Sequence, residues 1–164
     1  MRLAAAILLF LVPLSCGYSA GQISSGRGRT LAIPMFTNRT LRRDLERDLT
    51  RFVREEAAAR TSYSLVDGSA ADVVVTGKLV DVNEDVLSDR SKGGIRESSV
   101  VFTVVVTVTD RTGNRSGGRK IVDGRRMVER ASFVPVKGES LRTAEVLVMR
   151  RIAERVVYSL SSEW

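Results

Sequence analysis

One stretch of the chain, about residues 41–59, repeats apolar residues at the three- and four-residue spacing of an amphipathic helix. The pattern predicts a helix with Thr40 as its N-cap and with one buried stripe, formed by Leu41, Leu45, Leu49, Phe52, Val53 and Ala57. The opposite face is charged, and the pairs Arg42/Glu46 and Arg51/Glu55 lie one turn apart. We therefore expect this face to be solvated and to form its ion pairs within the helix.

A second helix is predicted at about Leu141–Ser161, after a cap at Ser140, with one face formed by Leu141, Ala144, Val148, Ile152 and Val156. Between the two helices the apolar residues alternate with polar ones, as in half-buried strands. The clearest alternation runs over Ser98–Thr109 and predicts a buried face of Val100, Phe102, Val104, Val106 and Val108. Another strand is expected at Ala71–Val82, with an extension to about Leu87.

Three weaker apolar segments complete the pattern. Strands are predicted at Ser62–Val66 and at Lys120–Val134, and a strand at Thr30–Phe36 contains Pro34, which favours a sheet edge or a bulge. The order is strand, helix, several strands, helix, with short turns between consecutive strands. It predicts an α+β two-layer sandwich, in which a mostly antiparallel sheet of four to five strands carries two helices on one face.

The N-terminus has the pattern of a bacterial lipoprotein signal. Arg2 precedes an apolar run, Leu3–Leu14, that is too short to span a bilayer, and the small residue Ser15 stands directly before Cys16. We interpret residues 1–15 as a signal peptide, Cys16 as the acylated first residue, 16–29 as a flexible tether and 30–164 as one domain. Pro13 departs from the leucine usual three residues before the cysteine, and the alternative is a secreted protein cut elsewhere.

Composition narrows the chemistry. The chain has no histidine and one cysteine, which lipidation would use, so no metal, no cofactor and no enzymatic activity are expected. The net charge is +7, and most of the cations are arginine, whose planar guanidinium binds phosphate with two hydrogen bonds. Two explanations of this charge are open: the protein binds an anionic partner, or arginine is simply its usual surface cation. Nucleic acid is not expected, because the strands lack base-stacking aromatic residues.

Two basic, glycine-containing loops are the candidate anion sites. The first contains Arg90, Lys92 and Arg96 beside Gly93-Gly94, and the weaker second contains Arg115, Arg119 and Lys120. One predicted strand separates them, so they are expected at opposite ends of the sheet. Alternatively, the basic residues of these loops bind no ligand and only keep the ends of the hairpins soluble.

Four segments in order resemble the LptE family of lipopolysaccharide-assembly lipoproteins. Cys16-Gly17-Tyr18 precedes the tether, and Ile33–Thr40 is similar to the family's I-P-x-F-x-N-x-T strand and turn. Residues 45–61 are similar to its first helix, and Ala71–Leu79 to its A-D-x-x-x-x-G-x-I strand. The resemblance covers nearly the whole chain after the signal and is weakest from Gly113 to Val136.

This resemblance implies a lipid-anchored protein on the periplasmic side of the outer membrane. It would plug the LptD β-barrel, bind lipopolysaccharide and assist its insertion into the outer membrane, and only Cys16 transfers from the family by position. The alternative is a lipoprotein that activates a periplasmic peptidoglycan synthase by contact, because those regulators also begin with an apolar strand, an F-x-N-x-T-like turn and a helix.

Overall fold

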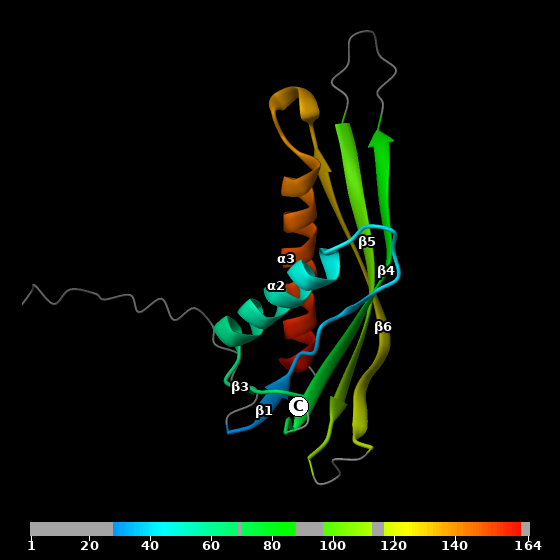
Figure 1. The fold of residues 1–164 in the computed structure, drawn as a ribbon. Helices are drawn as coiled ribbons and strands as arrows, with labels where there is room; N and C mark the ends of the chain where they lie inside the picture. Colours follow the sequence, from blue (N-terminus) through cyan, green and yellow to red (C-terminus); the bar gives the residue numbers. More distant parts are fainter. Residues whose placement is uncertain (1–27, 69, 88–96, 113–116, 162–164) are drawn as a thin grey trace, which may run out of the picture.

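The structure is a computed structural model, and it describes residues 28–68, 70–87, 97–112 and 117–161. Its frame is a meander of three long antiparallel strands, β4 (Val73–Leu87), β5 (Glu97–Asp110) and β6 (Arg119–Phe133) (Figure 1). These strands confirm the predicted mostly antiparallel sheet. The alternation predicted for β5 is also confirmed, since the five residues expected on its inner face are all buried.

Three short strands extend the sheet on the far side of β4. They are β1 (Thr30–Ala32), β2 (Thr37–Asn38) and β3 (Ser64–Leu65), and the six-stranded sheet has the order β3-β1-β4-β5-β6, with β2 also paired to β4. All the pairings of these short strands are parallel. The chain leaves β1, forms a helix and returns to the same end of the sheet at β3, which a parallel pairing requires.

Both helices lie on one face of the sheet, as predicted (Figure 1). Helix α3 (Leu141–Ser161) packs against β5 and β6, and α2 (Leu45–Arg60) packs against α3 and the short strands β2 and β3. A one-turn 3₁₀ helix, η2 (Pro135–Lys137), joins β6 to α3. The inner faces of both helices and of the sheet form a single apolar core.

The start of α2 differs from the prediction. The helix begins at Leu45, its N-cap is Asp44 in the left-handed conformation with φ 67°, and Leu41 is fully exposed. The Thr40 hydroxyl does not cap the helix: it accepts the Arg42 amide at 3.3 Å, within the turn before Leu45, and donates a 2.8 Å hydrogen bond to Oδ1 of Asn38. The four residues before the helix instead form a turn that Asn38 holds.

The strand predicted at Thr30–Phe36 is divided into β1 and β2. Pro34 lies in the gap between them, and β1 is an inner strand between β3 and β4. Of the two places expected for Pro34, a sheet edge or a bulge, the edge was therefore wrong. The gap lets the chain turn Phe36 into the core, where the ring packs directly on the backbone of Gly77 in β4.

Strand β6 contains a bulge at Gly124. This residue has a φ of 61°, and the pairing register between β5 and β6 shifts there.

Candidate functional site

The two motifs that carry the family resemblance meet in the structure. Phe36, from the first motif, packs on Gly77, from the second, so closely that a Cβ atom at Gly77 would overlap the ring. At the other end of the second motif, Asp72 Oδ2 accepts hydrogen bonds from the Thr30 amide at 2.9 Å and the Thr30 hydroxyl at 2.8 Å. These contacts therefore join β1 and β4.

Asn38 organises the turn that enters α2. Its amide nitrogen donates to the Arg42 carbonyl at 2.6 Å and to the Glu46 carboxylate at 2.7 Å, while its oxygen accepts from the Thr40 amide at 2.8 Å. An aspartate in this place has the acceptor oxygen but lacks the NH₂ donors. The asparagine of the motif thus has a structural role that depends on both ends of its amide.

Two side chains of α2 fix the segment between β1 and β2, and sequence reasoning missed both. The Thr50 hydroxyl accepts the Phe36 amide at 2.9 Å, and Arg54 donates to the Ile33 carbonyl from Nε at 2.9 Å and from Nη2 at 2.6 Å. Arg54 is one of the charged residues on the helix face that the periodicity predicts to be solvated. Its partner is a carbonyl group 21 residues away, which helical periodicity does not reveal.

A cluster of charged residues ties α2, β4 and α3 together. Arg42 pairs with Glu84 of β4 at 3.0 Å and with Glu145 of α3 at 2.7 Å, and not with Glu46 as predicted. Arg142 of α3 pairs with Glu145 at 3.5 Å and with Asp48 of α2. The Arg51–Glu55 pair at 2.9 Å is the predicted one within the helix.

Asp48 makes this cluster sensitive to acid. Its hydrogen bond to Arg142, with the charges of Arg142, Arg51 and Arg47, lowers the pKa of the carboxyl group despite partial burial. Asp48→Asn is expected to reduce the free energy of unfolding at pH 7 by about 0.5–1 kcal/mol. Because the folded-state pKa lies below the unfolded value, this difference is fully present above about pH 4 and disappears as the pH falls through the folded-state pKa.

Urea denaturation of both proteins between pH 7 and pH 2 measures this difference. Asp67→Asn, at an exposed position, serves as the control and is expected to change stability by less than about 0.5 kcal/mol. An Asp48→Asn deficit of the same size at pH 2 as at pH 7 would contradict the assignment.

The predicted basic sites are only partly within the described residues. Cys16, the Arg90, Lys92 and Arg96 cluster and Arg115 lie outside them. Arg119 and Lys120 begin β6, where both side chains are exposed and Lys120 pairs with Asp123 at 2.9 Å. The strand ends that flank the two loops, Leu87 opposite Glu97 and Asp110 opposite Arg119, lie at opposite ends of the sheet.

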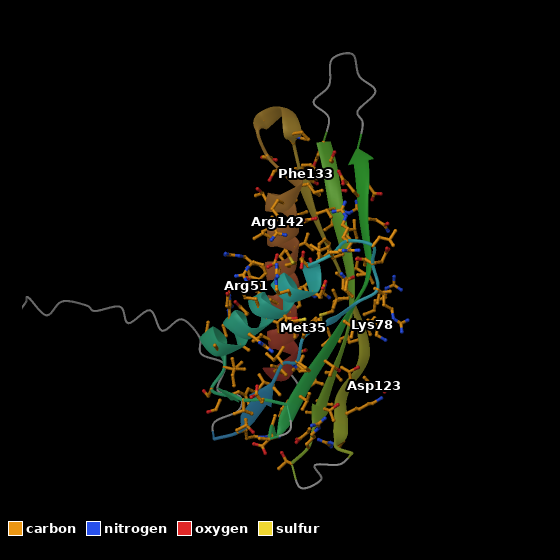
Figure 2. All side chains as sticks on the ribbon, viewed as in Figure 1. Met35, Arg51, Lys78, Asp123, Phe133 and Arg142 are labelled. Atoms are coloured by element: carbon orange, nitrogen blue, oxygen red, sulfur yellow. The ribbon has the colours of Figure 1, made fainter. Side chains whose placement is uncertain are left out.

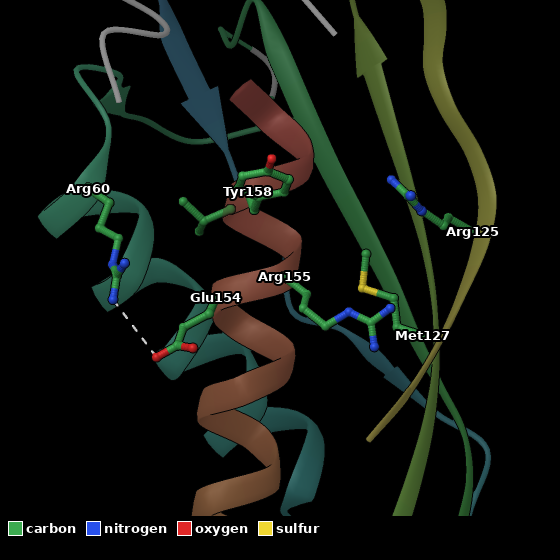
Figure 3. Close-up of a pocket in the computed structure, with 7 residues that line it drawn as sticks. Arg60, Arg125, Met127, Glu154, Arg155 and Tyr158 are labelled. Carbon is green, nitrogen blue, oxygen red and sulfur yellow. Dashed lines mark ion pairs between the residues drawn. The ribbon is translucent and has the colours of Figure 1, made fainter. Parts of the chain in front are cut away.

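A basic region that sequence reasoning missed lies along β6. Arg125, Arg126 and Arg130 are exposed on this strand, and Arg151 and Arg155 of α3 reach toward it. Beside it is a cavity of about 320 Å³ where α3 meets β6 (Figure 3), lined by Arg60, Arg125, Met127, Glu154, Arg155, Val157 and Tyr158. The alternation along β6 is weak, so its sequence alone did not indicate which side chains gather here.

Figure 2 shows how the charged side chains divide between the two layers. Arg51 and Arg142 lie on the helical layer, and Lys78 and Asp123 lie on the sheet. No group of histidine, cysteine or acidic residues in the described ranges is arranged to hold a metal ion. Neither α2 nor α3 has the length and apolar character needed to cross a membrane, and the same holds for every helix of the described residues.

Comparisons with known proteins give a family and a fold. The model of the LptE family, described as lipopolysaccharide-assembly, matches residues 28–160. Among solved structures, the hypothetical protein CT253 from Chlamydia trachomatis is similar over 84% of this chain and 98% of its own, at 12% identity and a TM-score of 0.55. A search of curated proteins finds no match.

Two further similar structures are both called lipoprotein B. An uncharacterized lipoprotein B from Nitrosomonas europaea aligns over 87% of this chain and 88% of its own, at 12% identity and a TM-score of 0.51. The rare lipoprotein B from Shewanella oneidensis aligns over 80% and 94%, at 18% identity and a TM-score of 0.50. At these identities the similarity establishes a common fold, in which two helices cover one face of an open sheet.

Proposed function

Because the chain belongs to the LptE family of lipopolysaccharide-assembly proteins, we propose that it plugs an LptD-like β-barrel and assists the insertion of lipopolysaccharide into the outer membrane. The family match carries the proposal, since it extends from before β1 to the last turn of α3. The motif residues Phe36, Asn38, Asp72 and Gly77 hold segments of the fold together, so the residues that match the family have structural roles here.

The proposal includes a lipid anchor at Cys16, after a signal peptide at 1–15, followed by a tether at 16–29 and a single domain at 30–164. It thereby places the protein on the periplasmic side of the outer membrane. Its similarity in fold to two proteins called lipoprotein B agrees with a lipoprotein of the envelope. The sequence Ser15-Cys16 after an apolar run carries this part of the proposal.

Purification of the tagged full-length protein from detergent-solubilised envelopes tests both parts. We expect a large β-barrel protein as the major partner and an intact mass that fits diacylglycerol and acyl groups on an N-terminal Cys16. In Cys16→Ala the lipid mass should be absent. Recovery of a peptidoglycan synthase in place of a barrel would overturn the proposed function, and an unmodified N-terminus after Cys16 would overturn the anchor.

We further propose that lipopolysaccharide phosphates bind the cluster of Arg90, Lys92 and Arg96. These cations are close together in the sequence, beside two glycines, with no acid between them and Glu97. The rival cluster of Arg115, Arg119 and Lys120 is less suitable, because the ion pair between Lys120 and Asp123 offsets part of its charge.

Replacement of all three residues in each cluster by glutamine separates these two sites. Lipopolysaccharide binding by the full-length protein in nonionic detergent is expected to weaken about tenfold at low salt for the first cluster and to lose part of its salt dependence. The second set of substitutions should leave both properties nearly unchanged. Equal effects, or none, would exclude the first cluster as the specific site.

A further inference from the structure

Strand β6 forms one edge of the sheet, because it pairs with β5 alone among the described strands. The carbonyl groups of Val128 and Arg130 point away from β5, since each accepts a hydrogen bond from an arginine of α3. Arg155 donates to Val128 at 3.3 Å, and Arg151 donates to Arg130 at 2.8 Å. The amide and carbonyl of one strand residue point to the same side, so both residues direct their amides outward as well.

A cavity accompanies this edge. Its walls include the apolar side chains of Met127 and Val157 and the ring of Tyr158, while Arg125 and Arg155 contribute guanidinium groups (Figure 3). Its volume of about 320 Å³ is at the lower end of the range for a ligand pocket. Arg155 belongs to both features, because it lines the cavity and hydrogen-bonds the strand edge.

We propose that the β6 edge and this cavity are a docking site for an extended acidic segment of a partner protein, which adds to the sheet as a strand beside β6. In this mode of recognition, main-chain hydrogen bonds provide affinity and side-chain pockets provide specificity. The partner would place an apolar side chain in the cavity, against the exposed ring of Tyr158 and above the buried Met127. Its carboxylates would meet the cations of Arg125, Arg126 and Arg130, although a 3.7 Å ion pair with Asp85 of β4 offsets part of the Arg130 charge.

The charges on β6 favour such a partner over a second copy of the chain paired about Val128. If two β6 edges paired antiparallel about Val128, Arg126 of each copy would lie opposite Arg130 of the other. Like charges directly across a strand pair are destabilising. An acidic segment would instead place carboxylates at these positions, so in this register the edge is complementary to a foreign strand. A register centred on Met127 would set Arg125 opposite Glu129 of a second copy, and self-association is therefore one of the outcomes that would overturn the proposal.

Arg151 and Arg155 protect the β6 edge from unspecific strand pairing when no partner is bound. Their long side chains satisfy two outward carbonyls, which would otherwise attract any exposed strand. Arg155 also pairs with Glu129 on the same strand. When a partner strand arrives, its amides replace these side-chain donors. The Arg151 guanidinium is then released to bind a carboxylate of the partner, while Arg155 keeps its ion pair with Glu129.

The test uses full-length protein in nonionic detergent and a synthetic, end-blocked peptide in which glutamate alternates with threonine or valine around one leucine. Fluorescence anisotropy should detect binding, and hydrogen exchange should show new protection of the Val128 and Arg130 amides. Arg126→Gln with Arg130→Gln is expected to weaken binding about tenfold. Arg43→Gln with Arg47→Gln removes the same charge from exposed positions at the start of α2, and should have little effect.

Two peptide controls distinguish strand addition from general attraction. A peptide with lysine in place of glutamate, and one N-methylated at alternate amides so that it cannot pair with an edge, should both fail to bind. Equal binding of the N-methylated peptide, or binding without protection of Val128 and Arg130, would overturn the proposal. Self-association of the protein with protection of these two amides in the absence of peptide would also overturn it, in favour of a second copy.

Discussion

Leu49→Ala is expected to lower the free energy of unfolding by about 2–5 kcal/mol, the range for removing a large aliphatic side chain from a core. Leu49 is 0% exposed and lies on the inner face of α2, within the core shared by both helices and the sheet. Alanine at this position would lose the burial of the side chain and leave a cavity that the surrounding helices and strands fill only in part. Urea denaturation, with the midpoint and slope both measured, gives the difference.

The control for Leu49 is a charged residue on the opposite face of α2. Arg47→Ala is suitable, because Arg47 is exposed and its ion pair with Asp44 is long, at 3.7 Å, so a change below about 0.5 kcal/mol is expected. Arg51 is a poorer control, since its guanidinium carbon lies 4.4 Å from the centre of the Phe52 ring. Equal losses for Leu49→Ala and Arg47→Ala would contradict the inner face assigned to α2.

Gly77→Ala is expected to destabilise the protein by about 1–3 kcal/mol through overpacking. The added methyl group would overlap the ring of Phe36, which is buried and whose backbone amide is fixed by Thr50. The ring therefore moves only if the segment between β1 and β2 moves with it. Gly68→Ala is the matched control, because nothing lies within 4 Å of the new Cβ atom and little change is expected.

A double-mutant cycle with Phe36→Leu tests the cause of this effect. Phe36→Leu by itself should lower the free energy of unfolding. In the Phe36→Leu background, however, Gly77→Ala should lower it by much less than in the wild-type background. The coupling is measured from the four unfolding free energies. Additive losses would show that the methyl group at Gly77 acts on something other than the Phe36 ring.

The features that the sequence predicted well are those set by local spacing. Helix α3 has the predicted bounds, and the Ser140 hydroxyl accepts the Thr143 amide at 3.1 Å, as a cap should. The buried face of β5 follows directly from alternation over its length. In both cases the periodicity of a single segment is sufficient to predict which of its residues are buried, without knowledge of the segments that pack against it.

The features that it missed depend on contacts between distant segments. The start of α2 is displaced because Asn38 binds groups in the turn and the first turn of the helix, and the role of Arg54 depends on the Ile33 carbonyl. The basic region at β6 becomes visible only when α3 is placed over that strand. The two loops of the predicted anion sites were located by composition, which does not determine what they bind.

The position of the two helices in the chain has a consequence for folding. The β4–β5–β6 meander is made of consecutive strands, so its contacts close short loops, whereas the pair between Arg42 and Glu145 joins residues 103 positions apart. As the polypeptide emerges N-terminus first, the valine-rich face of β5 stays uncovered until residues 141–161 are available. During that interval the nascent chain exposes its most aggregation-prone surface, and the arrival of its last helix ends this period.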